Sequence, residues 1–238
     1  MSHPQTRRVT TTLAGLLSLG LAASAQAILI NEIRIDQPGP DRDEYFELAG
    51  IAGESLDGLS YLVLGDSRKG RSGVIESVTR LNGLQVSASG YFLAAESSFS
   101  LATSTDLITS LQFENSDNVT HLLVRDFTAR NGDDLDIDDD GLLDITPWTD
   151  ILDSIALVKS FTRGEKIYST TTIGTGNGNV PVHVFRDPSQ RGAWQIGNMA
   201  STDDTAGRAN GVIAVPEPGT LTLLAMGLLA WRCRTEKR

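Results

Sequence analysis

Between residues 28 and 200, the apolar residues of this chain fall into short stretches rich in Ile, Val, Leu, Tyr and Thr. Gly, Asp, Asn and Ser separate these stretches, a pattern that predicts β-strands and turns. A helical period is indicated only weakly, at Asp106–Leu111. Short strands joined by turn-rich links favour an all-β, antiparallel β-sandwich. The expected strands are Leu29–Ile35, Glu44–Leu48, Ser60–Leu64, Gly73–Leu81, Tyr91–Ala94, Val119–Arg125, Ile151–Val158, Ile167–Thr172 and Val180–Phe185.

The first 27 residues have the three parts of a secretory signal peptide. Arg7 and Arg8 form its basic region, Leu13–Ala22 is apolar and would form a helix, and Ala25 and Ala27 make an A-x-A cleavage site. We therefore expect residues 1–27 to be removed during export across the inner membrane. The mature chain would begin at or near Ile28.

The C-terminus has three further parts in a fixed order. Pro216-Glu217-Pro218 is followed by the apolar run Thr220–Trp231 and then by Arg232, Arg234, Lys237 and Arg238. The apolar run is 12 residues long and is expected to form a short helix, whereas a helix needs roughly 20 residues to span a bilayer. The basic end would stay in the cytoplasm. The other interpretation of this segment is a plain hydrophobic anchor or an amphipathic helix.

These three parts, residues 215–238, resemble the PEP-CTERM sorting signal of exopolysaccharide-producing Gram-negative bacteria. The resemblance implies processing by the membrane protease-transpeptidase exosortase, after a transient membrane association of the tail. It also implies delivery to the cell surface or the extracellular matrix, where exopolysaccharide or other surface proteins would be partners. Residues 201–214 are small, polar and rich in Gly and Ala, as expected of a linker.

Without the two sorting segments, the body of the chain is strongly acidic. Of the 20 Lys and Arg residues and the 30 Asp and Glu residues, 14 and 28 lie in the body, which gives a net charge of −14. Nucleic acid is therefore not an expected partner, because its phosphates require cationic contacts. The one cysteine, Cys233, lies in the tail, so the body is expected to fold without a disulfide.

The first strands resemble the lamin-tail domain. Its "INE" strand is matched at Ile30-Asn31-Glu32, its "EY-x-EL" strand at Glu44–Leu48, its "L-x-G" turn near Gly58, and a later strand at Gly90–Leu93. The resemblance implies an immunoglobulin-like β-sandwich, here at residues 28–200 and with insertions. It covers residues 28–125 well and the rest of the body loosely.

The Asp-rich loop, residues 131–144, carries the most specific chemical pattern in the body. Asp136-x-Asp138-x-Asp140-Gly141 reproduces the first half of an EF-hand-type calcium loop, in which side-chain oxygens converge on one ion and a glycine permits the sharp turn. The Leu142 carbonyl and Asp144 would follow at positions seven and nine. Pro147 replaces the glutamate of position twelve. We therefore expect a weak, structural calcium site at Asp136, Asp138, Asp140, Leu142 and Asp144. A solvated turn without an ion is the alternative.

Catalytic signatures are scarce. Alternation along the strand directs Glu44 and Glu47 to opposite faces, so they cannot form a carboxylate pair. His121 and His183 lie in expected strands and have no metal-ligand spacing. We expect a non-catalytic structural or adhesive protein. The alternatives are a metal-dependent hydrolase of phosphoesterase or nuclease type, with a histidine near the Asp-rich loop, and a small carbohydrate-binding module with exposed aromatic residues.

Overall fold

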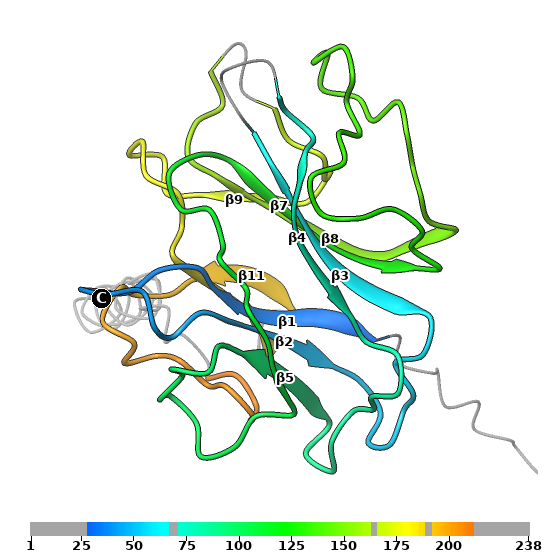
Figure 1. Cartoon of the computed structure of the whole chain (residues 1–238). Coiled ribbons are helices and arrows are strands. Elements are labelled where there is room, and N and C mark those ends of the chain that lie inside the picture. Colours follow the sequence, from blue (N-terminus) through cyan, green and yellow to red (C-terminus); the bar gives the residue numbers. More distant parts are fainter. Residues whose placement is uncertain (1–27, 67–70, 163–165, 189–191, 212–238) are drawn as a thin grey trace, which may run out of the picture.

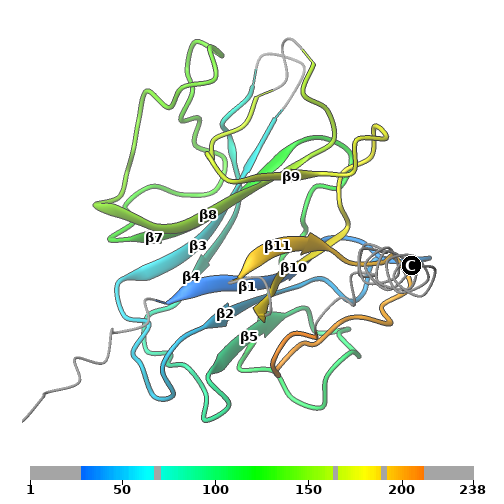
Figure 2. The same cartoon turned by 180° about the vertical axis from the view of Figure 1, so that it is seen from behind.

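The computed structural model describes residues 28–66, 71–162, 166–188 and 192–211. Their strands form two sheets, which Figure 1 shows one above the other and Figure 2 shows from behind. The first sheet has the order β11 (Ala193–Ile196), β10 (His183–Asp187), β1 (Leu29–Arg34), β2 (Tyr45–Ala49), β5 (Tyr91–Ala95) and β6 (Leu107–Ile108). The second has the order β4 (Ile75–Arg80), β3 (Leu59–Gly65), β7 (Val119–Arg125), β8 (Asp150–Val158) and β9 (Thr172–Gly174).

The all-β, two-sheet architecture confirms the expectation from the sequence, and the described residues contain no helix. Three details differ. The pairs β5–β6 and β8–β9 are parallel, so neither sheet is purely antiparallel. The strand expected at Ile167–Thr172 lies later, at β9, and the weak helical signal falls on β6. The strand β11 was not among the expected strands.

The main core lies between the two sheets. It contains the inward-facing residues of both, among them Ile33, Phe46, Leu48, Val63 and Leu123, all fully buried. The rings of Phe46 and Tyr61 stack across the interface, with centroids 3.8 Å apart and an interplanar angle of 3°. Such large aromatic residues dominate core energetics because each removes a large apolar area from water.

The outer face of each sheet is covered as well. On the second sheet, Leu62, Leu122 and Val124 pack against Leu135 and Trp148, which belong to the segment that contains the Asp-rich loop. On the first sheet, Tyr45, Leu93 and Ala95 pack against Ala206. This double coverage explains why all seven residues of β3 are buried, because a strand covered on both faces need not alternate between apolar and polar residues.

We call residues 198–211 the C-terminal strap. Part of it was expected to be a linker, but Asp204, Thr205 and Ala206 are at most 9 % exposed. In Figure 1 this orange segment runs along the outer side of the first sheet. The described part of the expected linker is therefore folded onto the body.

The sorting segments lie outside the described residues. This applies to the signal helix with Ala25 and Ala27, and to the apolar helix expected in the tail, with Pro216, Glu217, Pro218 and Cys233.

Candidate functional site

The Asp-rich loop is fastened to the second sheet beside β4. The amide of Leu135 donates to the carbonyl of Gly73, and the amide of Ile75 donates to the carbonyl of Asp133. Val74 and Asp134 form an isolated β-bridge. The loop therefore starts from a fixed base, although Asp138 and Asp144 at its outer part are exposed.

Asp136 is the centre of the loop and is fully buried. Its Oδ1 accepts a hydrogen bond of 3.1 Å from the amide of Asp140, and its Oδ2 accepts one of 2.9 Å from the amide of Gly141. Gly141 has a φ of +92°, a conformation that glycine adopts without a steric penalty. The sharp turn expected at this glycine is thus present.

Carboxylate oxygens of Asp136, Asp138 and Asp144 lie within 4.8 Å of one another. Of the five expected ligand residues, these three are brought together. The Oδ1 of Asp140 accepts a hydrogen bond of 2.7 Å from the amide of Leu142, and neither of these two residues belongs to the group of three. Oxygen atoms are the ligands that calcium prefers, and it takes six to eight of them. Three carboxylates, neighbouring carbonyls and water can supply that number.

Two residues near the loop have no signal in the local sequence. The hydroxyl of Tyr168 donates a hydrogen bond of 2.7 Å to the Oδ2 of Asp136, and burial together with this bond raises the pKa of Tyr168. Lys166 lies over the turn, since a Cβ at Gly141 would be 3.6 Å from its ammonium nitrogen. Both residues follow β8 in the chain, so only the fold brings them to the loop.

A second group of polar residues is buried beneath the C-terminal strap, and Glu32 of β1 is at its centre. The Oε1 of Glu32 accepts from the hydroxyl of Tyr45 at 2.6 Å and from the amide of Thr205 at 2.9 Å. The Nε2 of His183 lies 2.8 Å from the same oxygen. The Oε2 accepts from the hydroxyl of Thr205 at 2.7 Å. All four residues are at most 9 % exposed, so the strap supplies bonds that water cannot.

Asp204 of the strap forms an ion pair with Arg34 of β1, and the two side chains are 3 % and 0 % exposed. The Nε of Arg34 donates to Oδ1 at 2.6 Å, and its Nη2 donates to Oδ2. The guanidinium also donates to the carbonyls of Asp36 and Asn198. The planar guanidinium can bond to both oxygens of a carboxylate at once, and the bonds to the two carbonyls satisfy further N–H donors of the guanidinium.

The ligand atoms of Glu32, His183 and Asp204 also lie within 4.8 Å of one another. However, the guanidinium of Arg34 already occupies both oxygens of Asp204. A metal ion there would meet this fixed positive charge. The group therefore fits an internal ion-pair network that fastens the strap, rather than a metal centre.

Glu44 and Glu47 have separate partners, which confirms that they point apart. Glu44 accepts from the amide of Phe113 at 3.1 Å, whereas Glu47 accepts from the side chain of Asn31 at 2.6 Å and from the amide of Gly207. Burial raises the pKa of each carboxyl to about 8. Each is a buried hydrogen-bond acceptor.

The two histidines are also engaged within the body. His121 is fully buried, and its Nδ1 lies 2.8 Å from the hydroxyl of Tyr61. It shares the inner face of β7 with Leu123, whereas the Asp-rich segment covers the outer face through Leu122 and Val124. His183 belongs to the other sheet. Neither imidazole has a described contact with the Asp-rich loop.

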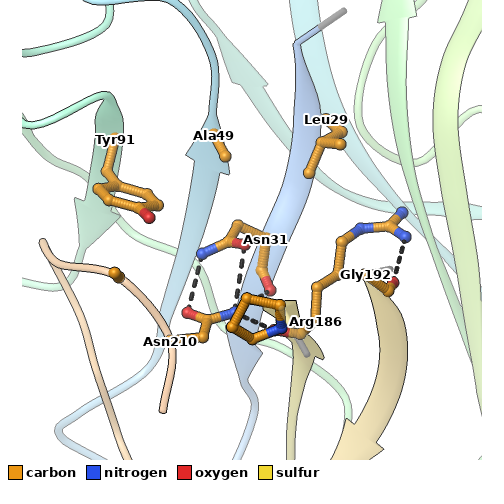
Figure 3. A pocket seen from close by; sticks show the side chains of 9 residues that line it. Leu29, Asn31, Ala49, Tyr91, Arg186, Gly192 and Asn210 are labelled. Atoms are coloured by element: carbon orange, nitrogen blue, oxygen red, sulfur yellow. Dashed lines mark hydrogen bonds between the residues drawn. The ribbon is translucent and has the colours of Figure 1, made fainter. Parts of the chain in front are cut away.

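A pocket of about 290 Å³ opens on the outer face of the first sheet. Figure 3 shows Tyr91 at one side, Arg186 at the other, and the amides of Asn31 and Asn210 between them. Asn31 donates to Asn210 at 2.9 Å, and Asn210 donates back to Asn31 at 3.2 Å. Its apolar walls are formed by Leu29, Ala49, Pro188 and Ala209.

The described residues thus define an all-β protein of two sheets, with an acidic loop over one outer face and a buried ionic network over the other. The described part of the chain contains no helix long and apolar enough to cross a membrane.

The C-terminal tail shows how the protein is sorted. Residues 214–238, which include Pro216, Glu217 and Pro218, match the family model of the PEP-CTERM protein-sorting motif. The motif implies that the protein is exported, processed by exosortase and sorted to the cell surface. No curated protein and no solved structure matches the chain. The match of the tail does not extend to the body.

Proposed function

We propose that this is a non-catalytic protein of the cell surface or extracellular matrix, structural or adhesive in role, whose β-sandwich is stabilised by calcium. The observation that carries the proposal is the approach of the oxygens of Asp136, Asp138 and Asp144 to within 4.8 Å of one another. Exopolysaccharide and other surface proteins are the partners expected at the destination that the tail specifies.

Electrostatics favour a bound cation in the loop. Carboxylates at such separations repel one another by about 1 kcal/mol per pair in water and by more when one of them is buried, as Asp136 is. A divalent cation would reverse the sign of this energy. Calcium outside cells is in the millimolar range, and weak extracellular sites have a Kd of about 10⁻⁴ to 10⁻³ M. A site of that affinity would be mostly occupied.

The role of the ion would be structural. The Asp-rich segment covers an outer face of the second sheet through Leu135 and Trp148. An ion that joins Asp136, Asp138 and Asp144 would hold this cover in place. The buried, hydrogen-bonded positions of His121 and His183 support a non-catalytic interpretation, because a general base must reach its substrate.

The lamin-tail resemblance is retained as part of the proposal. The residues that carry it lie in β1, β2 and β5 of one sheet, and Gly58 of the "L-x-G" turn has a φ of +76°. We propose that the body is a sandwich of this type, enlarged by the Asp-rich segment and the strap.

Thermal unfolding in calcium and in chelator tests the calcium site. For a Kd of about 10⁻⁴ to 10⁻³ M, 10 mM calcium stabilises the folded state by about 1.4 to 2.7 kcal/mol. The Tm should therefore rise by about 3 to 10 °C. In Asp138→Asn and Asp144→Asn this rise should shrink, whereas the control Asp150→Asn removes an exposed charge outside the group. An equal Tm in calcium and chelator would refute the site.

A further inference from the structure

The pocket on the first sheet has polar groups that the fold leaves unused. A guanidinium has five N–H donors. Those of Arg186 donate to the carbonyl of Ile30 from Nε, to the carbonyl of Gly192 from Nη1, and to both oxygens of Asp153 from Nη2. Because Asp153 belongs to β8 of the second sheet, these bonds hold the guanidinium in place as one wall of the pocket.

Tyr91 and Asn31 supply two further groups. No described residue bonds to the hydroxyl of Tyr91, which Figure 3 shows directed from β5 toward the pocket. Burial raises the pKa of Tyr91, so the hydroxyl keeps its proton. The Oδ1 of Asn31 accepts one bond, from Asn210, and an amide oxygen can accept two. The Tyr91 hydroxyl, a donor and acceptor, and the Asn31 Oδ1, an acceptor, thus line the same pocket.

The charge of the pocket favours an uncharged ligand. None of the described residues that line it is acidic. Arg186, the one cation among the described lining residues, is neutralised by Asp153, with bonds of 3.0 and 2.8 Å. An anion would also be repelled by the acidic body, with its formal charge of −14. A cation would find no carboxylate among the described residues of the pocket walls.

The size of the pocket and the chemistry of its walls further limit the class of ligand that it can bind. A volume of about 290 Å³ is near the lower end of the range for small-molecule sites. The walls are apolar at Leu29, Ala49 and Pro188, and Tyr91 adds an aromatic ring. A sugar ring combines an apolar C–H face with hydroxyls at its rim, and it therefore matches an aromatic ring next to neutral hydrogen-bonding groups.

We propose that this pocket binds one neutral sugar ring of a surface polysaccharide. The C–H face of the ring packs against Tyr91, and its hydroxyls bond to the Tyr91 hydroxyl and the Asn31 Oδ1. This inference deepens the adhesive role proposed above and rests on it, although the pocket and the Asp-rich loop lie on different sheets.

The test titrates the purified full chain with neutral methyl hexosides and neutral hexose oligosaccharides, followed by NMR or calorimetry. We expect Kd values in the millimolar range for the single rings, which corresponds to about −4 kcal/mol at 1 mM. Tyr91→Ala should weaken binding on the order of tenfold, since it removes both the ring and the hydroxyl. Tyr91→Phe keeps the ring and should lose less. Phe161→Ala, which removes an exposed aromatic ring outside the pocket lining, is the control and should bind like the wild type.

Several outcomes would overturn the proposal. These are an absence of saturable binding of any neutral sugar up to about 50 mM, unchanged affinity in Tyr91→Ala, or tighter binding of glucuronate or inorganic phosphate than of the neutral rings. The wild type is also titrated in chelator. Sugar binding that persists there, with no calcium effect on the Tm, would refute the calcium site and leave the sugar site standing. A calcium effect on the Tm without sugar binding would refute the sugar site and leave the calcium site standing.

Discussion

Asp204→Ala is the most informative single change. Among the described residues of the strap, Asp204 is the one charged residue that forms an ion pair with the guanidinium of Arg34. Arg34 is fully buried and would keep only carbonyl acceptors, among them those of Asp36 and Asn198. The hydroxyl of Tyr45, 2.8 Å from Asp204, would lose that contact as well. The variant therefore leaves an uncompensated positive charge inside the protein.

The structure sets the expected size of the effect. Removing one partner of a buried, hydrogen-bonded ion pair costs about 3 to 5 kcal/mol. For a body of this length, that loss lowers the Tm by about 6 to 20 °C. The exposed pair Arg130–Asp133 offers a control, since Arg130 is 87 % exposed. Arg130→Ala should cost less than about 1 kcal/mol.

Urea unfolding followed by tryptophan fluorescence measures both variants and the double variant Arg34→Met/Asp204→Leu. The double variant should recover much of the loss, because replacing a whole buried pair by apolar residues is often neutral. If Asp204→Ala unfolded within about 1 kcal/mol of the wild type, the strap would not be held by this pair. The network described beneath it would then be wrong.

Three further outcomes are expected. Burial raises the pKa of Glu47 from 4.5 to about 8. The contribution of Glu47 to stability is therefore complete below pH 4.5 and is lost as the pH rises through about 8. The free energy of unfolding measured from pH 5 to 9 should show this decline, and Glu47→Gln should flatten it. Burial lowers the pKa of His121 from 6.5 to about 3. The contribution of the neutral imidazole to stability is therefore complete above pH 6.5 and is lost as the pH falls toward 3. An NMR titration of the imidazole with a midpoint above pH 5 would contradict this pKa. Gly73 has a φ of +77°, and a Cβ there would lie 2.6 Å from the Cβ of Asp136. Gly73→Ala should therefore destabilise more than Gly53→Ala, which has a similar φ of +79° but open space around it, and for which about 1 to 2 kcal/mol is expected; equal unfolding free energies would count against the packing of the Asp-rich loop on Gly73.

The sequence predicts the elements of this fold better than the way they are covered. Stretches such as Leu59–Gly65 indicate strands by composition alone. The strap could not be recognised, because its Ser, Thr, Asp and Gly residues have the composition of a linker. They become buried only through partners far away in sequence, such as Glu32 for Thr205, at a separation of 173 residues.

The same distinction applies to the candidate sites. Asp136, Asp138 and Asp144 could be predicted to meet, because they lie within one loop and their spacing is typical of a calcium site. Tyr168 contacts Asp136 from 32 residues away, and no local pattern indicates it. The pocket proposed to bind sugar is assembled from β1, β2, β5, β10 and the strap, so no single stretch of sequence carries its signature.

The sheet order also determines how this body can associate with copies of itself. The outermost strands are β6, β9 and β11, with two, three and four residues, and β4, whose first residue, Ile75, is hydrogen-bonded to Gly132 and Asp133 of the Asp-rich loop. Short or covered edges offer few unpaired amides to the strand of another molecule. A protein crowded at a cell surface is thereby protected from growing into fibres by edge-to-edge pairing. Its contacts with neighbouring molecules must then be made by loops and side chains. Such contacts can form and break while both sheets stay intact.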